Sequence, residues 1–273
     1  MGINREFVAT MLDLRRAGML KDHATVIELG AQDISADPRA VAGMLAAEKL
    51  GSAAEPVPLA SDLYRRLGYV SYAAIDANGL HGAKVFDLNR DLKDAYGFAD
   101  TFDLVTNLGT LEHCFDQAAA FRNMHRLCKP GGLMIHCLPT QGLVNHAFYN
   151  YHPRFVADLS AANGYEIERI FFTADFKPEM VRYSIAAFKE RDDRDLLIYA
   201  VLRKTSAADF QMPFDGMFSD ESHIEYANRV SRAEIFASDF AAYIKTSWCN
   251  IRADAPLPPD GKRSLFRALF GRT

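Results

Sequence analysis

The chain has 273 residues, of which 49% are hydrophobic and 24% are charged, and its formal net charge is −4. This length suffices for one large α/β core with a short extension, and the small negative charge gives no electrostatic footprint of a nucleic-acid-binding protein. The four cysteines form no C-x-x-C pair, which indicates free thiols in a reducing compartment. Neither a signal-peptide profile nor an apolar run of membrane-spanning length is found, so we expect a cytoplasmic protein.

The first part of the chain alternates helical and extended patterns. An amphipathic helix is expected over 7–20, and an apolar strand over 25–30 ends in an acid and a glycine. A second helix begins near residue 37, because Pro38 suits the first turn of a helix. Residues 51–68 are interpreted as an insertion before the next strand.

Two further predicted strands each end at an acid. The strand over 70–75 leads to Asp76, and a short strand over 84–88 contains Asp87. An acid at the end of the second strand of a doubly wound sheet can accept hydrogen bonds from both hydroxyls of a ribose. Asp76 lies further from Gly30 than the roughly 20 residues usual in dinucleotide-binding folds, because the insertion intervenes.

Residues 102–140 carry a strand–helix–strand pattern. An apolar run closes with Asn107 and Gly109, and Glu112 and His113 follow. Apolar residues then recur at helical spacing until the sequence KPGG at 129–132 ends the helix, and a second apolar strand follows. Such a unit needs a right-handed crossover and a parallel sheet.

The FDLV, LEH and KPGG sequences of this segment resemble the fourth and fifth strands of class I S-adenosylmethionine-dependent methyltransferases. The resemblance implies a Rossmann-like, doubly wound and mostly parallel seven-stranded sheet with helices on both faces. Strands over 165–173 and 196–203, with a helix over 181–191 between them, would complete this sheet. It also implies S-adenosylmethionine as cofactor and a small-molecule acceptor methylated at oxygen or nitrogen, as in many bacterial members.

The same resemblance implies a cofactor site at the ends of the strands. Its candidate residues are Glu28, Gly30, Gln32, Asp76, Asp87, Asn107 and Gly109. Gln32 stands where the family usually has a second glycine, so its side chain either narrows the pocket or hydrogen-bonds the ligand. A blocked pocket would make the chain a catalytically silent methyltransferase-like subunit. An NAD(P)-binding oxidoreductase is the third alternative, weakened by the degenerate glycine loop.

The segment 141–153 occupies the place where such an enzyme would hold its acceptor, and it combines two His, two Tyr and two Asn. His146 is the first candidate for acid–base catalysis and His113 the second, because the pKa of histidine is nearest neutrality. Alternatively, His146 caps the following helix. The candidate substrate-binding residues are Glu112, Asn145, Tyr149 and His152, and Phe148 and Tyr151 are expected in the core.

We expect a methyltransferase-like domain over 1–204 and a helical C-terminal extension over 205–273. The tail over 261–273 is basic and amphipathic, so it would lie on an anionic membrane, dock on a protein partner or pack on its own domain. The extension could also cap the active site or build a homo-oligomer contact. No metal site is expected, because the spacing of the His and Cys residues over 125–137 fits no zinc pattern.

Overall fold

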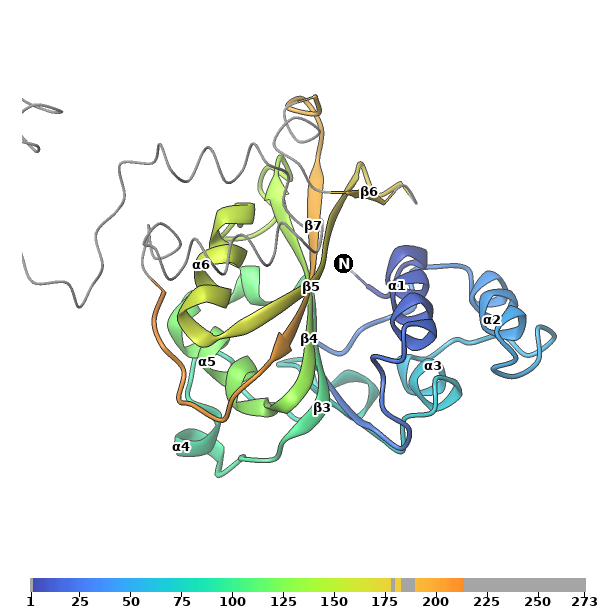
Figure 1. The fold of residues 1–273 in the computed structure, drawn as a ribbon, viewed down its shortest axis with the longest axis horizontal. Coiled ribbons are helices and arrows are strands. Elements are labelled where there is room, and N and C mark those ends of the chain that lie inside the picture. Colours follow the sequence, from blue (N-terminus) through green and yellow to red (C-terminus); the bar gives the residue numbers. More distant parts are fainter. Residues whose placement is uncertain (1, 178–179, 183–189, 214–273) are drawn as a thin grey trace, which may run out of the picture.

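The computed structural model describes residues 2–177, 180–182 and 190–213. The strands are β1 (Thr25–Leu29), β2 (Ser71–Ile75), β3 (Phe102–Leu108), β4 (Cys128–Gln141), β5 (Tyr165–Ala174), β6 (Val181–Arg182) and β7 (Leu196–Lys204). They form one seven-stranded sheet in the order β2-β1-β3-β4-β7-β5-β6 (Figure 1). The first four strands in this order are parallel, whereas β7 is antiparallel to both β4 and β5. The predicted mostly parallel, Rossmann-like sheet is therefore confirmed.

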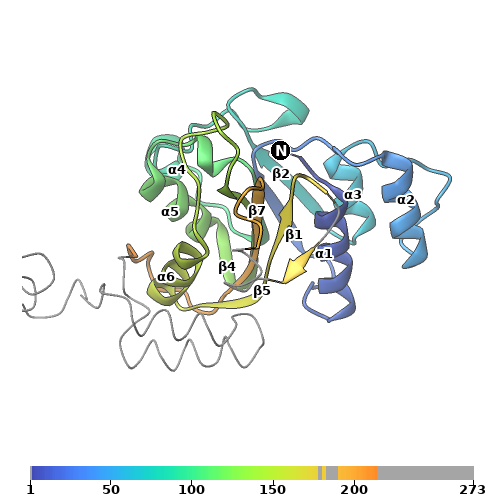
Figure 2. The same cartoon turned by 90° about the horizontal axis from the view of Figure 1, so that it is seen from above.

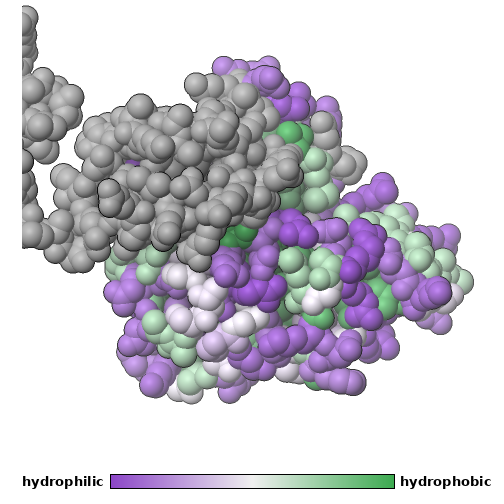
Figure 3. Space-filling view, in the orientation of Figure 1, coloured by the Kyte–Doolittle hydropathy of each residue, from purple (hydrophilic) through white to green (hydrophobic). Residues whose placement is uncertain are grey.

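Helices cover both faces of the sheet, as Figures 1 and 2 show from two directions. On one face lie α1 (Arg5–Arg16), α2 (Pro38–Ala47) and α3 (Ala60–Arg66), and on the other lie α4 (Leu92–Tyr96), α5 (Gln117–Leu127) and α6 (Pro153–Asn163). Each layer encloses its own hydrophobic core. On the face that Figure 3 shows, hydrophilic residues are interspersed with smaller hydrophobic areas.

Several of the helices begin at a residue whose side chain caps them. The Asn4 side chain accepts a hydrogen bond from the backbone N–H of Phe7, and the Asp116 side chain accepts one from Ala119. Asp37 caps α2 in the same way, with Pro38 in the first turn. The start of α2 is therefore as predicted, whereas α1 begins at Arg5 and not at residue 7 and ends at Arg16 and not at residue 20.

The predicted strand over 84–88 is wrong. Lys84 makes only an isolated bridge to Ile75, and the chain then leaves the sheet. Asp87 accepts hydrogen bonds from the backbone and side chain of Asn89, which closes a tight turn. Val85 is 63% exposed, so this segment lacks the buried face that would hold it on the sheet.

The predicted helix over 181–191 is also wrong at its start. Val181 and Arg182 instead pair with Phe172 and Phe171 as the short edge strand β6. The positions 183–189, and the predicted tail over 261–273, lie outside the described residues. Within the described chain, no helix has both the length and the apolar character needed to cross a bilayer.

Candidate functional site

The candidate site is built from loops at one edge of the sheet. We call them the β1 loop (30–36), the β3 loop (109–116) and the β4 loop (142–152). They follow parallel strands, so all three leave the sheet at its carboxyl edge, together with Asp76 at the end of β2. Ligands of open α/β sheets bind at this edge.

Glu28 lies within β1 and is fully buried. Its carboxyl group accepts hydrogen bonds from the Tyr64 hydroxyl (2.9 Å) and the Tyr72 hydroxyl (2.8 Å), and it also accepts one from the backbone N–H of Gln32 (3.4 Å). Burial raises the pKa of Glu28 to about 7, although these hydrogen bonds oppose the rise. Glu28 therefore connects the β1 loop to an aromatic layer. The sequence interpretation missed both tyrosines, whose signal was their place on the apolar faces of α3 and β2.

Gly30 begins the β1 loop with a φ of 87°, a conformation that other residues rarely adopt. A Cβ atom at this position would lie 2.2 Å from the Thr110 hydroxyl oxygen and 2.7 Å from the Gln32 side-chain nitrogen. Gln32 is buried and donates a hydrogen bond from Nε2 to that same hydroxyl at 3.3 Å. The Gln32 side chain thus spans the site from the β1 loop to the β3 loop, directly beside the glycine.

Asp76 sits half-buried at the end of β2, as predicted. Its Oδ2 accepts a hydrogen bond from the backbone N–H of Ala31 (2.9 Å), and its Oδ1 accepts one from Asn78 (3.0 Å). An ionised carboxylate can accept about four hydrogen bonds, so Asp76 retains capacity for a ligand. Asp87 is exposed in its turn, where its Oδ1 accepts both hydrogen bonds from Asn89.

Asn107 organises the β3 loop from inside. Its Oδ1 accepts hydrogen bonds from the backbone N–H groups of Thr110 (3.2 Å) and Leu111 (3.1 Å), while its Nδ2 lies 3.3 Å from Nδ1 of His136. Gly109 has a φ of 81°, which permits the sharp turn between these contacts. Asn107 is fully buried, so its visible role is to hold the shape of the loop.

The structure brings together Glu112, His113 and His146. Their ligand-capable atoms all lie within 4.8 Å of one another, and Nε2 of His146 is 3.7 Å from Oε1 of Glu112. Burial raises the pKa of Glu112 to about 7, whereas burial and the neighbouring His146 lower the pKa of His113. The backbone N–H of Phe148 donates to the carbonyl of Glu112 at 3.1 Å and holds the two loops together.

The other predicted substrate residues lie elsewhere. Asn145 is exposed with a φ of 63°, and His152 is exposed at the start of α6. Tyr149 and His152 line a cavity of about 500 Å³ beside α6. The prediction that Phe148 belongs to the core is wrong, because its side chain is 66% exposed. Tyr151 is buried as predicted.

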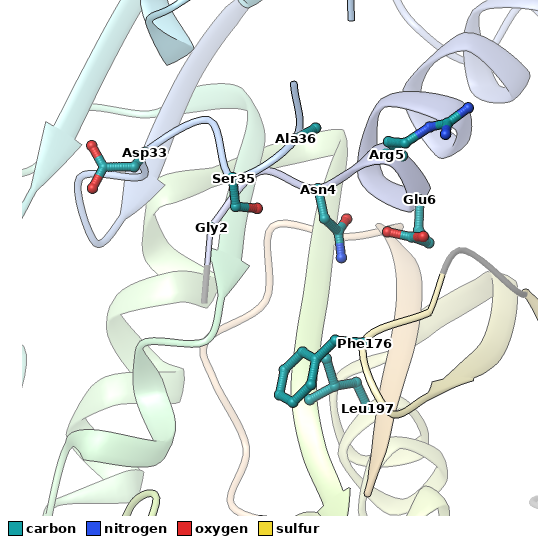
Figure 4. Close-up of a pocket in the computed structure, with 9 residues that line it drawn as sticks. All are labelled: Gly2, Asn4, Arg5, Glu6, Asp33, Ser35, Ala36, Phe176 and Leu197. Atoms are coloured by element: carbon teal, nitrogen blue, oxygen red, sulfur yellow. The ribbon is translucent and has the colours of Figure 1, made fainter. Parts of the chain in front are cut away.

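A cavity of about 530 Å³ opens at the carboxyl edge on the α1 side (Figure 4). It is lined by the N-terminal segment, the β1 loop and the ends of β5 and β7, through Gly2, Asn4, Arg5, Glu6, Asp33, Ser35, Ala36, Phe176 and Leu197. The N-terminal segment is held there because Ile3 pairs with Ile34. Asn4 projects toward Phe176 and Leu197 in Figure 4, whereas Arg5 extends away from them.

The sequence analysis did not include the N-terminal residues Gly2, Asn4, Arg5 and Glu6 in the site. The strongest chemical feature among them is Glu6, which is 5% exposed and whose pKa is raised by burial. The only sequence signal was a polar run immediately before an amphipathic helix, which also reads as ordinary capping. The cavity therefore places the buried Glu6 beside the edge at which the cofactor candidates lie.

Comparison with known proteins gives one family match. A family model described as a methyltransferase domain matches residues 5–178, a range that contains the β1, β3 and β4 loops and Asp76. No curated protein matches the chain.

Several solved structures are similar to this chain at low identity. TehB from Haemophilus influenzae is 10% identical, with a TM-score of 0.44 over 72% of this chain and 62% of that one, so the match spans less than two thirds of TehB. The 1,6-didemethyltoxoflavin-N1-methyltransferase of Burkholderia thailandensis is 13% identical, with a TM-score of 0.43 over 74% and 78%. The N-methyltransferase NodS of Bradyrhizobium japonicum is 12% identical, with a TM-score of 0.44 over 74% and 89%.

Proposed function

Because the chain belongs to the methyltransferase-domain family, we propose that it transfers a methyl group from S-adenosylmethionine to an oxygen or nitrogen of a small molecule. The observation that supports this most directly is the convergence of the β1 loop, Asp76 and the β3 loop at the carboxyl edge of the sheet. These are the positions at which we expect the cofactor from the family resemblance. The family match also argues against an NAD(P)-binding oxidoreductase.

The residues at this edge suit such a cofactor. A side chain at Gly30 would collide with Thr110 and Gln32, so a glycine is needed where the β1 loop packs against the β3 loop. The half-buried Asp76 carboxylate can accept hydrogen bonds from ribose hydroxyls in addition to the one from Ala31. Gln32 can offer its amide to the carboxylate or amine of the methionine part. When bound, S-adenosylmethionine supplies an electrophilic methyl group on a sulfonium.

The protein then has two tasks, which are to align the acceptor and to take up its proton. Alignment alone can contribute several kcal/mol to catalysis. His146 is the proposed base and His113 the second candidate, since both rings lie in loops at the carboxyl edge and their centroids are 5.1 Å apart. Glu112, Asn145, Tyr149 and His152 are the proposed acceptor contacts.

One observation favours a second function. The contact between Gln32 and Thr110 crosses the place where the family's second glycine would leave open space. If a ligand cannot displace this contact, the chain is a catalytically silent methyltransferase-like subunit. Gln32 would then be the residue that distinguishes it from an active enzyme.

Titration calorimetry separates these functions. An active enzyme should release or absorb heat with S-adenosylmethionine and S-adenosylhomocysteine and give none with NADPH. A silent subunit should give neither heat nor a thermal shift with millimolar S-adenosylhomocysteine.

For the C-terminal extension we propose a contact with an anionic membrane, a protein partner or a second copy of the chain, which vesicle sedimentation and light scattering would test.

A further inference from the structure

The carboxyl group of Glu112 is buried without a hydrogen-bond partner. The residue has no exposed surface, and neither Oε1 nor Oε2 makes a hydrogen bond within the described residues. A buried carboxylate is costly unless it is paired, coordinates a metal or is protonated. Among the described basic side chains, only His146 comes within 4.0 Å of it, with Nε2 at 3.7 Å from Oε1.

The imidazole of His146 also has a buried polar atom without a hydrogen bond within the described structure, namely Nε2. The ring of His113 approaches that of His146 at an interplanar angle of 68°, with centroids 5.1 Å apart. Two imidazoles and one carboxylate therefore converge on a small volume, and no Lys or Arg side chain of the described residues pairs with the carboxylate.

The chain holds these residues from two sides. Glu112 and His113 lie in the short 3₁₀ turn Leu111–His113, which directly follows β3. His146 comes from the β4 loop, where its backbone N–H bonds to the carbonyl of Leu143 and Leu143 adopts a φ of 52°. The loops are joined by the hydrogen bond from Phe148 to the carbonyl of Glu112. The cluster is thus supported by backbone contacts on both sides.

We propose that Glu112, His113 and His146 bind a divalent transition-metal ion. Two imidazole nitrogens and one carboxylate form a donor set typical of catalytic zinc and of non-haem iron sites, which keep further coordination positions open. Ligand atoms about 2.1 Å from one ion lie roughly 3–4 Å apart, so the cluster needs only a small contraction from 4.8 Å. The exposed His113 can supply this movement.

The ion would change how the acceptor is activated. A hydroxyl group bound to a divalent cation loses its proton more readily than a free one. His146 cannot ligate the ion and accept a proton through the same nitrogen, so in the metal-bound protein it is a ligand and not a base. Metal binding itself does not depend on the proposed methyl transfer.

The test is calorimetric titration of the full chain, stripped with a chelator, using zinc chloride alone. We expect one Zn²⁺ per chain, with the affinity lowered tenfold or more in Glu112→Gln and in His146→Ala. His23→Asn is the matched control, because it removes an exposed histidine on the other edge of the sheet and should bind zinc as the wild type does. Magnesium chloride should bind more weakly, since Mg²⁺ prefers an all-oxygen ligand set.

Cobalt(II) gives a second readout. The visible absorption of bound Co²⁺ should appear with the wild type and disappear with Glu112→Gln, a nearly isosteric change that removes a buried charge and is expected to leave the fold intact. Saturable zinc binding that Glu112→Gln leaves unchanged would overturn the proposal, and so would the absence of saturable binding. Titration of the metal-free protein with S-adenosylhomocysteine reports cofactor binding separately, so failure of one proposal is distinguishable from failure of the other.

Discussion

The side-chain amide of Gln32 donates a hydrogen bond to the hydroxyl of Thr110 at 3.3 Å, and this contact joins the β1 loop to the β3 loop. The two loops follow neighbouring parallel strands, since β1 pairs with β3. The glycine that begins the β1 loop lies directly under the contact. The hydrogen bond beside Gly30 is a neutral one, and such a bond contributes about 1 kcal/mol.

We predict that Gln32→Gly leaves the affinity for S-adenosylhomocysteine within about tenfold of the wild type, or about 1.4 kcal/mol. The reason is that the amide of Gln32 replaces, as a ligand contact, the backbone approach that a glycine would allow. Calorimetry on both proteins measures this directly. A large gain in affinity would show instead that Gln32 blocks the site, and Thr110→Val, which removes the hydrogen-bond acceptor, should then give a gain as well.

Asp76→Ala should weaken binding of S-adenosylhomocysteine by about 1–3 kcal/mol, because it removes charge-assisted hydrogen bonds to the ligand. The change also removes the acceptor for the backbone N–H of Ala31, so thermal unfolding must be measured beside affinity. Asp62→Ala serves as the control, since Asp62 pairs with Arg65 on the surface of α3. Equal affinities for Asp76→Ala and the wild type would remove Asp76 from the cofactor site.

Replacing His146 by alanine should lower the rate of methyl transfer by roughly 10²-fold or more while the affinity for S-adenosylhomocysteine stays unchanged. Single-turnover kinetics at saturating cofactor measure the rate. The alternative that His146 caps a helix is wrong, because the residue before α6 is His152, whose side chain makes no capping bond. Val144→Ala, in the same loop but 88% exposed, should keep full activity. A fully active His146→Ala protein would remove this residue from catalysis.

Most of the sheet was predictable from the sequence because its strands are apolar runs closed by turn residues. The prediction of a strand failed where the local sequence pattern and the tertiary packing disagreed. Residues 84–88 have strand-like composition, yet the turn between Asp87 and Asn89 and the stacking of Phe86 on Tyr96 (4.3 Å between ring centroids) draw them off the sheet. Such a contact between distant residues leaves no periodic signal.

The sequence predicted which residues belong to the site better than it predicted which of them contact one another. The strand-end positions of Asp76 and of the Glu112-His113 pair follow from the pattern alone. The pairing of Glu112 with His146 does not, because it depends on how the β4 loop folds back, with positive φ at Leu143 and Asn145. Sequence spacing therefore gave no metal pattern, although the folded chain gathers a suitable donor set.

His136 should make the protein sensitive to acid. Burial lowers the pKa of His136 to about 3, below the value of about 6.5 expected in the unfolded chain. The unfolded state therefore binds more protons between these two values, and the stability from this group is lost as pH falls below about 6.5, by up to about 1.4 kcal/mol per pH unit.

Urea unfolding of the wild type and of His136→Gln at pH 5 and pH 7 checks this prediction. The free energy of unfolding should fall further between pH 7 and pH 5 in the wild type than in the variant. The two proteins share their other titrating groups, so the difference between them isolates His136. Identical losses in the two proteins would contradict the assignment.

The place of β7 in the sheet has a consequence for biosynthesis. This strand comes last in the sheet along the chain, yet it lies between β4 and β5 and pairs with both. Until residues 196–204 have left the ribosome, the exposed backbone edges of β4 and β5 have no partner and could pair with other chains. Completion of the sheet is therefore a late, long-range event in synthesis, and a chain interrupted before Leu196 would be prone to aggregate.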